Sequence, residues 1–100
     1  MFLAKVIGTV VSSQKHPALD GRKLLLIMPH ITRDGKQVPS GSSIVAVDAV
    51  NAGEGQYVMF TQGSSARLTD ATKSCPVDAV VIGIVDTVEI AGVRSELPAE

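Results

Sequence analysis

The sequence predicts an all-β or mostly β domain, and three observations lead to that prediction. Fourteen Val, seven Ile and six Thr supply 27 β-branched side chains, which fit a pleated strand better than a helix. The apolar segments are short and are separated by stretches that contain Gly, Pro and Asp-Gly steps. Hydrophobic residues make up 45% of the 100 residues, which is enough for a compact core in one domain spanning residues 1–100.

The first 43 residues are expected to contain two strands and two polar loops. Residues 2–11 carry Val, Ile and Thr in rough alternation and predict a strand. Residues 12–22 include an Asp-Gly step and predict a loop, after which residues 23–28 predict a second strand. Residues 29–43 are rich in Pro, Gly and charge, and their Asp34-Gly35 step predicts a hairpin tip that projects from the body.

The middle of the chain predicts two strands joined by a glycine-containing turn. Residues 44–50 place alternate side chains on opposite faces, the pattern of a strand with one face in a core. Residues 51–55 interrupt this pattern with two glycines, and residues 56–61 resume as a strand. We therefore expect residues 56–61 to be the antiparallel partner of residues 44–50 in a β-meander.

A short helix is expected after this pair of strands. Ser64 or Ser65 is placed to cap a first helical turn by accepting a hydrogen bond from a free backbone N–H. Pro76 forbids the continuation of a helix, so the predicted helix is short.

The last part of the chain predicts further strands. Residues 77–90 are the most strongly β-branched segment, and Ala91-Gly92 predicts a turn. Residues 93–97 predict a short terminal strand, which runs into a polar tail at residues 95–100. Five or six short strands with one short helix fit a small closed β-barrel of the oligonucleotide-fold type, narrow and filled by Val, Ile and Leu.

Charge and aromatic content argue against nucleic acid or membrane as partners. Nine Lys and Arg against ten Asp and Glu leave a net charge of -1, so the chain lacks a field that attracts phosphate. Phe2, Tyr57 and Phe60 are the three aromatic residues, too few for the stacking surface of a single-strand binder. The longest apolar run, residues 79–85, is far shorter than a membrane-spanning helix. A lone Cys75 and the lack of a leader pattern favour a reducing cytosol.

The glycine- and serine-containing motifs do not indicate catalysis or nucleotide binding. Gly63, Ser64 and Ser65 lack the glycine pattern and the strand-turn-helix context of a nucleophile elbow, so a helix cap is the better interpretation. Gly53 and Gly55 lack the third glycine of a dinucleotide fingerprint, and a strand rather than a helix follows them. A turn is expected there.

The titratable side chains are dispersed along the chain. The candidate metal ligands are His16, His30 and Cys75. They lack the close spacing of zinc ligands, and both histidines fall in predicted polar loops. Three carboxylates lie on or beside predicted strands: Asp48, Asp78 and Asp86. We interpret them as turn caps or as partners of Lys5 or Arg67 rather than as an acid–base pair. No enzyme, metal or cofactor is therefore expected.

A family resemblance rests on the order and spacing of several segments. These are KVIGTVVSS (5–13) with LLLI (24–27), AVDAV (46–50) leading to AGEG (52–55), GSSAR (63–67), and PVDA (76–79) ending in IVD (84–86). Together they resemble the bacterial microcompartment vertex proteins, the EutN/CcmL family of pentameric shell proteins of carboxysomes and of ethanolamine- and propanediol-type metabolosomes. The resemblance extends from Phe2 to about Val93 and implies a noncatalytic β-barrel protomer.

The resemblance also implies an assembly. It implies a cyclic homopentamer that closes the corners of a polyhedral shell within the bacterial cytoplasm, with hexameric shell proteins as neighbours. A head-to-tail ring brings one surface of each protomer against a different surface of the next. The candidate pore- or axis-lining residues come from two turns: Asn51, Ala52, Gly53, Gly63, Ser64 and Ser65. The candidate contacts between subunits are Phe2, Arg67, Asp86, Val88 and Ile90.

Two other functions compete with this interpretation. An oligonucleotide-fold module that binds single-stranded nucleic acid would need a basic groove with aromatic side chains, which the charge of -1 and the three aromatics disfavour. A small enzyme that uses Ser64 or Ser65 would need several polar groups gathered in one concave site, and the sequence disperses them.

Overall fold

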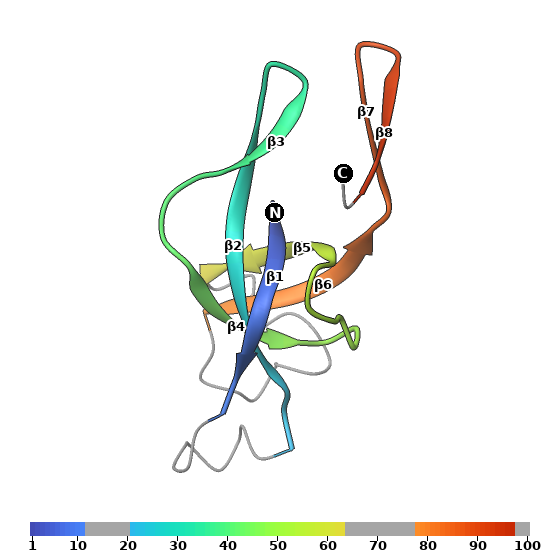
Figure 1. The fold of residues 1–100 in the computed structure, drawn as a ribbon. Coiled ribbons are helices and arrows are strands. Elements are labelled where there is room, and N and C mark those ends of the chain that lie inside the picture. The colour runs from blue at the N-terminus through green and yellow to red at the C-terminus, as the bar shows by residue number, and fades with distance from the viewer. Residues whose placement is uncertain (12–20, 64–77, 98–100) are drawn as a thin grey trace.

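The strands of the protein are drawn in Figure 1, a computed structural model that describes residues 1–11, 21–63 and 78–97. These residues form eight strands. They are, in chain order, β1 (Phe2–Val10), β2 (Leu24–Arg33), β3 (Lys36–Pro39), β4 (Ile44–Asp48), β5 (Tyr57–Gln62), β6 (Ala79–Val85), β7 (Thr87–Ile90) and β8 (Val93–Glu96). Six strands belong to one sheet, and β7 and β8 form a second, two-stranded sheet. The all-β prediction is confirmed.

Five strands of the larger sheet close into a ring. Antiparallel pairing joins β1 to β5, β5 to β6, β4 to β2 and β2 to β1, and a short parallel ladder between β6 and β4 completes the circle. The order β1-β2-β4-β6-β5 makes a small barrel of the oligonucleotide-fold type. Strand β3 pairs with the end of β2 and lies outside the ring. The predicted closed barrel is confirmed, whereas the predicted helix after Gly63 lies outside the described residues.

The pairing of β5 contradicts the β-meander that the sequence predicts. Strand β5 lies between β1 and β6, while β4 pairs with β2 and β6, so residues 56–61 are not the partner of residues 44–50. The connection between β4 and β5 crosses to β1 because the Val6 N–H donates to Gln56 O (2.9 Å) and the Gly55 N–H donates to Val6 O (2.8 Å). Closure gives β5 a partner on each edge, and open sheet edges are thereby reduced.

Side chains at alternate positions of each strand point inward and fill the inside of the ring. In β1, Ala4 and Val6 are buried while Lys5 between them is half-buried on the outer face. The core is formed by the inward residues Ala4, Val6, Leu25, Ile27, Ala46, Ala52, Val58, Phe60, Ala79 and Val81. Phe60 is the only ring among these mostly aliphatic side chains, so the barrel interior is packed rather than hollow, as predicted.

Two hairpins project from the barrel in the same direction (Figure 1). Strand β2 continues to Arg33, past its predicted end at residue 28, and pairs there with β3. Asp34 (φ 53°) and Gly35 (φ 76°) form the connecting turn, and Ala91 (φ 51°) and Gly92 (φ 82°) form that of β7 and β8. Positive φ at both turn residues is the geometry that suits the twist of a two-residue hairpin. The projecting tip predicted at residues 34–35 is confirmed.

The strongly β-branched segment at residues 77–90 forms two strands from residue 79 onward rather than one. It contains β6 and β7, separated at Asp86, because β6 completes the barrel while β7 leaves it to pair with β8. The Leu97 N–H donates to Asp86 O (2.8 Å) and closes the base of this hairpin. The terminal strand predicted at residues 93–97 is confirmed as β8, so Ser95 and Glu96 are part of a strand rather than of a tail. Residues 98–100 lie outside the described residues.

Candidate assembly surfaces

A buried carboxylate shapes the first of the two predicted axial turns. Asp48 ends β4 with its side chain 1% exposed, and its two oxygens accept the Val50 N–H (3.0 Å) and the Ala52 N–H (2.9 Å). The Lys23 Nζ lies 3.6 Å from Asp48 Oδ2 and donates to Ala52 O at 2.7 Å. The interpretation of Asp48 as a turn cap is confirmed. Among the described residues its cationic partner is Lys23 rather than Lys5, and Arg67 lies outside these residues.

The same turn exposes some of its residues and buries others. Asn51 is exposed with φ 59°, a left-handed conformation that Asn tolerates better than most residues. Gly53 is half-buried, and its N–H donates to Gln56 Oε1 at 2.7 Å. Ala52 lies in the core, so its side chain cannot face an opening of the protomer surface. Asn51 and Gly53 are thus the predicted axial residues that this turn presents outward.

The second predicted axial turn begins at Gly63, which has φ 68°. Its N–H donates to Asp78 O (2.8 Å) just before β6, and the Ala49 N–H donates to Val81 O (3.2 Å) within β6. Residues at the start of both predicted turns are therefore hydrogen-bonded to residues at or just before the beginning of β6. Ser64, Ser65 and Arg67 lie outside the described residues.

Three of the predicted subunit contacts lie together on the segment that forms the second hairpin. Asp86 is exposed at its base, and Val88 and Ile90 are half-buried along one face of β7. Val88 faces Ser95 across the hairpin, and Ile90 faces Val93. Phe2 is exposed at the start of β1, with its ring 5.6 Å from that of Phe60.

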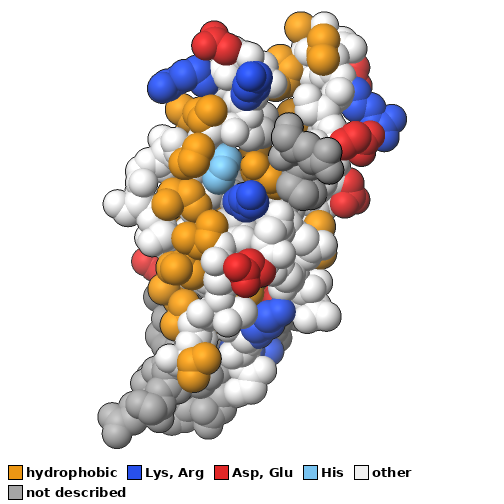
Figure 2. All heavy atoms as spheres, viewed as in Figure 1, with side chains coloured by type: hydrophobic (Ala, Val, Ile, Leu, Met, Phe, Trp, Pro, Cys, Tyr) orange, Lys and Arg blue, Asp and Glu red, His pale blue; other side chains and the backbone are white. Residues whose placement is uncertain are grey.

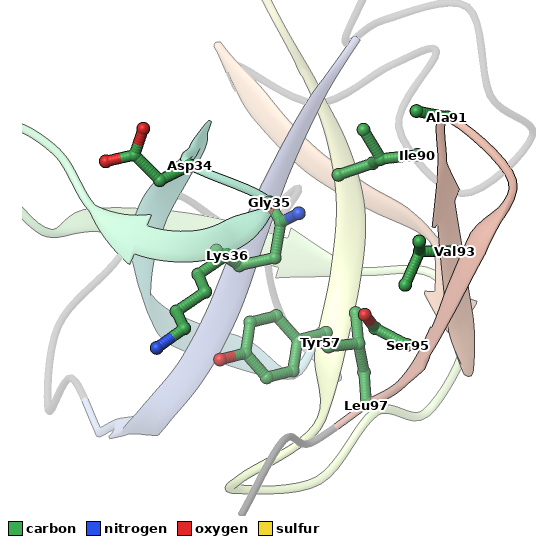
Figure 3. Close-up of a pocket in the computed structure, with 10 residues that line it drawn as sticks. Asp34, Gly35, Lys36, Tyr57, Ile90, Ala91, Val93, Ser95 and Leu97 are labelled. Carbon is green, nitrogen blue, oxygen red and sulfur yellow. The ribbon is translucent and has the colours of Figure 1, made fainter.

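A cleft of about 820 Å³ separates the two hairpins. Its lining residues are Asp34, Gly35, Lys36, Gln37, Tyr57, Ile90, Ala91, Val93, Ser95 and Leu97. Figure 3 shows Lys36 and Tyr57 on one side and Ile90, Val93, Ser95 and Leu97 on the other. The cleft was not predicted, because its two walls come from hairpins more than fifty positions apart in the chain.

Tyr57 lines this cleft and is 7% exposed. The Lys5 Nζ lies 5.7 Å from the centre of its ring, and the His30 ring meets it edge-on at 5.3 Å. The His30 Nδ1–H donates to Met28 O (2.8 Å). His30, expected in a solvated loop, is therefore a half-buried residue of β2 that packs on Tyr57.

Within residues 1–11, 21–63 and 78–97, no group of three His, Cys, Asp or Glu residues is placed to hold a metal ion. His16 and Cys75 lie outside these ranges. None of the helices in the described part of the chain is long and apolar enough to cross a membrane.

The comparisons with known proteins agree with the shape of the protomer. The family described as ethanolamine utilisation protein EutN/carboxysome matches residues 1–86. The microcompartment shell vertex protein GrpN of Rhodospirillum rubrum is 49% identical over 89 residues, which cover 89% of this chain and 97% of GrpN. The carboxysome shell vertex protein CcmL of Gloeobacter violaceus is 47% identical over 90 residues, which cover 90% of this chain and 87% of CcmL.

Solved structures of the same two proteins superpose on this chain. Gloeobacter violaceus CcmL gives a TM-score of 0.82 at 45% identity, with 94% of each chain covered. The pentameric shell protein GrpN gives a TM-score of 0.77 at 49% identity, with 90% of this chain and 100% of GrpN covered. The resemblance found in the sequence is confirmed, and the chain belongs to the EutN/CcmL family.

Proposed function

We infer that this chain is a structural, noncatalytic subunit of a bacterial microcompartment shell and that it forms homopentamers at the shell vertices. The observation that carries this function is the 49% identity to the vertex protein GrpN across 97% of its length, with the fold of a pentameric structure. A flat layer of hexagonal tiles cannot close without five-fold defects, and a pentamer at each corner supplies the missing curvature. The relatives are named as shell vertex proteins, which does not favour the alternative that this chain binds single-stranded nucleic acid.

The outer surface of the barrel supports assembly. Leu25 and Ile27 face the core, so the alternate residues of β2 face outward together with Val45 of β4. We call this surface the outer stripe: Leu24, Leu26, Met28 and Val45. Val45 is 48% exposed, and Figure 2 shows hydrophobic side chains gathered down this side of the molecule. A contiguous apolar surface on a soluble protomer marks a contact site.

The turns attached to β6 are the proposed lining of the five-fold axis. Asn51 and Gly53, or Gly63 with Ser64 and Ser65, approach the axis in this proposal, because small turn residues tolerate crowding. Asn51→Trp tests the first turn, with Glu54→Trp as a matched control on an exposed neighbour. Loss of pentamers in Asn51→Trp alone supports the axial position, and unaffected pentamers in both variants count against it.

Hexameric shell proteins are the proposed neighbours of the pentamer. Co-expression with a hexameric shell protein, followed by electron microscopy, tests this directly. We expect closed polyhedral particles when this chain is present, and open sheets or tubes when it is omitted. Particles that close equally well without the chain would contradict the vertex role.

A further inference from the structure

The cleft between the β2–β3 and β7–β8 hairpins has the size of a small-molecule binding site. Its volume of about 820 Å³ lies within the range of about 300–1,000 Å³ that is typical of ligand pockets. Such pockets combine apolar walls with a few polar groups that orient the ligand. The residues that line this cleft divide in the same way between its two walls (Figure 3).

One face of the β7–β8 hairpin forms the apolar wall. Ile90 pairs with Val93, and Ser95 lies two positions further along β8, so these three side chains share one face of the hairpin. All three line the cleft. Glu89 and Arg94 pair with each other on the opposite face. The wall is therefore uncharged and mainly apolar, and Val93 on it is 67% exposed.

The other wall is polar and carries the Tyr57 ring. Lys36 and Gln37 of β3 line the cleft on this side. The Gln37 Nε2 donates to Thr32 Oγ1 at 3.0 Å, which holds the amide in place. Figure 3 shows the Tyr57 hydroxyl directed toward the side of Lys36 and away from the β7–β8 wall. The polar end of an otherwise apolar ring thus lies on the same side as the ammonium group.

Positive charge prevails around Tyr57. The Lys5 Nζ lies 5.7 Å from the centre of its ring, and Lys36 lines the cleft with it. Neither ammonium group forms an ion pair with a described residue. Asp34 is the one carboxylate among the described lining residues, and it is exposed at the hairpin tip. Two positive charges against one negative charge suit a ligand that carries a single negative charge.

We propose that the cleft binds a small organic acid that has one negative charge and an apolar body. The acid group lies on the wall of Lys36 and Tyr57, where the ammonium group attracts it. The apolar body packs against Ile90 and Val93. Anions of higher charge are repelled by Asp34, and cations are repelled by Lys36, so the monoanion is selected. The site lies within one protomer and does not depend on the vertex function.

Two fluorescent probes with the same apolar body test the preference for a negative charge. Anilinonaphthalene sulfonate is a monoanion, and phenylnaphthylamine is the corresponding ring system without the sulfonate. Each probe is titrated into the full chain in its native assembly. We expect the sulfonate to bind saturably, with one molecule per chain. Octanoate should displace it at a concentration at least about tenfold lower than octylamine, which has a similar tail and a positive charge.

Two substitutions separate the charged contact from the apolar contact. Lys36→Gln should weaken binding of the sulfonate by at least about fivefold at low ionic strength, where charges are least screened, and should leave binding of the neutral amine unchanged. Val93→Thr keeps the branched shape but lowers the apolar area, so it should weaken binding of both probes.

A matched control accompanies each substitution. Arg94→Gln removes a cation from the face of β8 that is turned away from the cleft. Ile31→Thr makes the same kind of change as Val93→Thr at an exposed residue of β2 that does not line the cleft. Both controls should bind the two probes as the wild-type chain does. Circular dichroism verifies the fold, and size-exclusion chromatography with light scattering measures the oligomeric state of every variant.

The outcomes distinguish this site from the vertex function. A pentamer that binds no sulfonate, as when a neighbouring protomer covers the cleft, overturns the proposed site and leaves the vertex function standing. Equal effects of Lys36→Gln and Arg94→Gln, or of Val93→Thr and Ile31→Thr, also overturn the site. A monomeric chain that shows the expected pattern of binding supports the site and contradicts the vertex function.

Discussion

At the scale of single residues, Asp48 holds the turn that follows β4. Its two carboxylate oxygens hold the backbone of Val50 and Ala52, and Lys23 contacts both the carboxylate and the Ala52 carbonyl. Both oxygens are used, so the isosteric amide, which has one acceptor oxygen, cannot replace them. The turn that presents Asn51 depends on this carboxylate.

Asp48→Asn is expected to lower the free energy of unfolding by about 1–3 kcal/mol, because one N–H of the turn loses its charged acceptor. Lys23 is 41% exposed on its side chain, so the lost ion pair adds little to this. Urea denaturation at one fixed protein concentration measures the change. Asp34→Asn is the control, because Asp34 is exposed and Asn accepts its positive φ. Equal losses in the two variants would contradict the role of Asp48.

Ala91 adopts a conformation that favours other residues. Its φ of 51° costs an alanine about 1 kcal/mol relative to glycine, and Asn-Gly is a preferred pair for this turn. Ala91→Asn should therefore raise the free energy of local opening of β7 and β8 by about 0.5–1 kcal/mol. Hydrogen exchange should show this change in the hairpin amides and leave the barrel amides as they are. An unchanged hairpin would contradict the assignment of strain to this turn.

At the scale of elements, the β5–β6 ladder contains one position, Gly83, where an added side chain would be crowded. A Cβ at Gly83 would lie 2.6 Å from the Met59 Cε, and Met59 is the residue paired with Gly83. The methionine end is flexible and can move aside. Gly83→Ala should cost less than about 1 kcal/mol in free energy of unfolding, and the cost should disappear in a Met59→Ala background. A double-mutant cycle with no coupling between the two positions would disprove the contact.

The elements also show how far sequence reasoning extends. The Asp34-Gly35 turn was predictable because positive φ favours Asp and Gly, and the Ala91-Gly92 turn was predictable from its glycine alone. Period-two alternation identified the strands. The partner of β5 was not predictable from its neighbour in sequence, because ring closure places it between β1 and β6. The cleft at Tyr57 was missed for the same reason, since it depends on the relative position of two distant hairpins.

At the scale of the whole molecule, the protomer leaves surface that a ring would cover. The outer stripe is an apolar surface on the outside of the barrel. The barrel core is small, so burial of this surface between neighbours would add stability to a chain of 100 residues. In a closed head-to-tail ring, one surface of each protomer contacts a different surface of the next protomer.

The mass of the assembly is the most direct test of this account. Native mass spectrometry of the purified chain at micromolar concentration should give a dominant species of about 52 kDa, five times the 10.4 kDa of the chain. A single species at 10.4 kDa across the micromolar range, or a dominant ring of another size, would contradict the pentameric vertex.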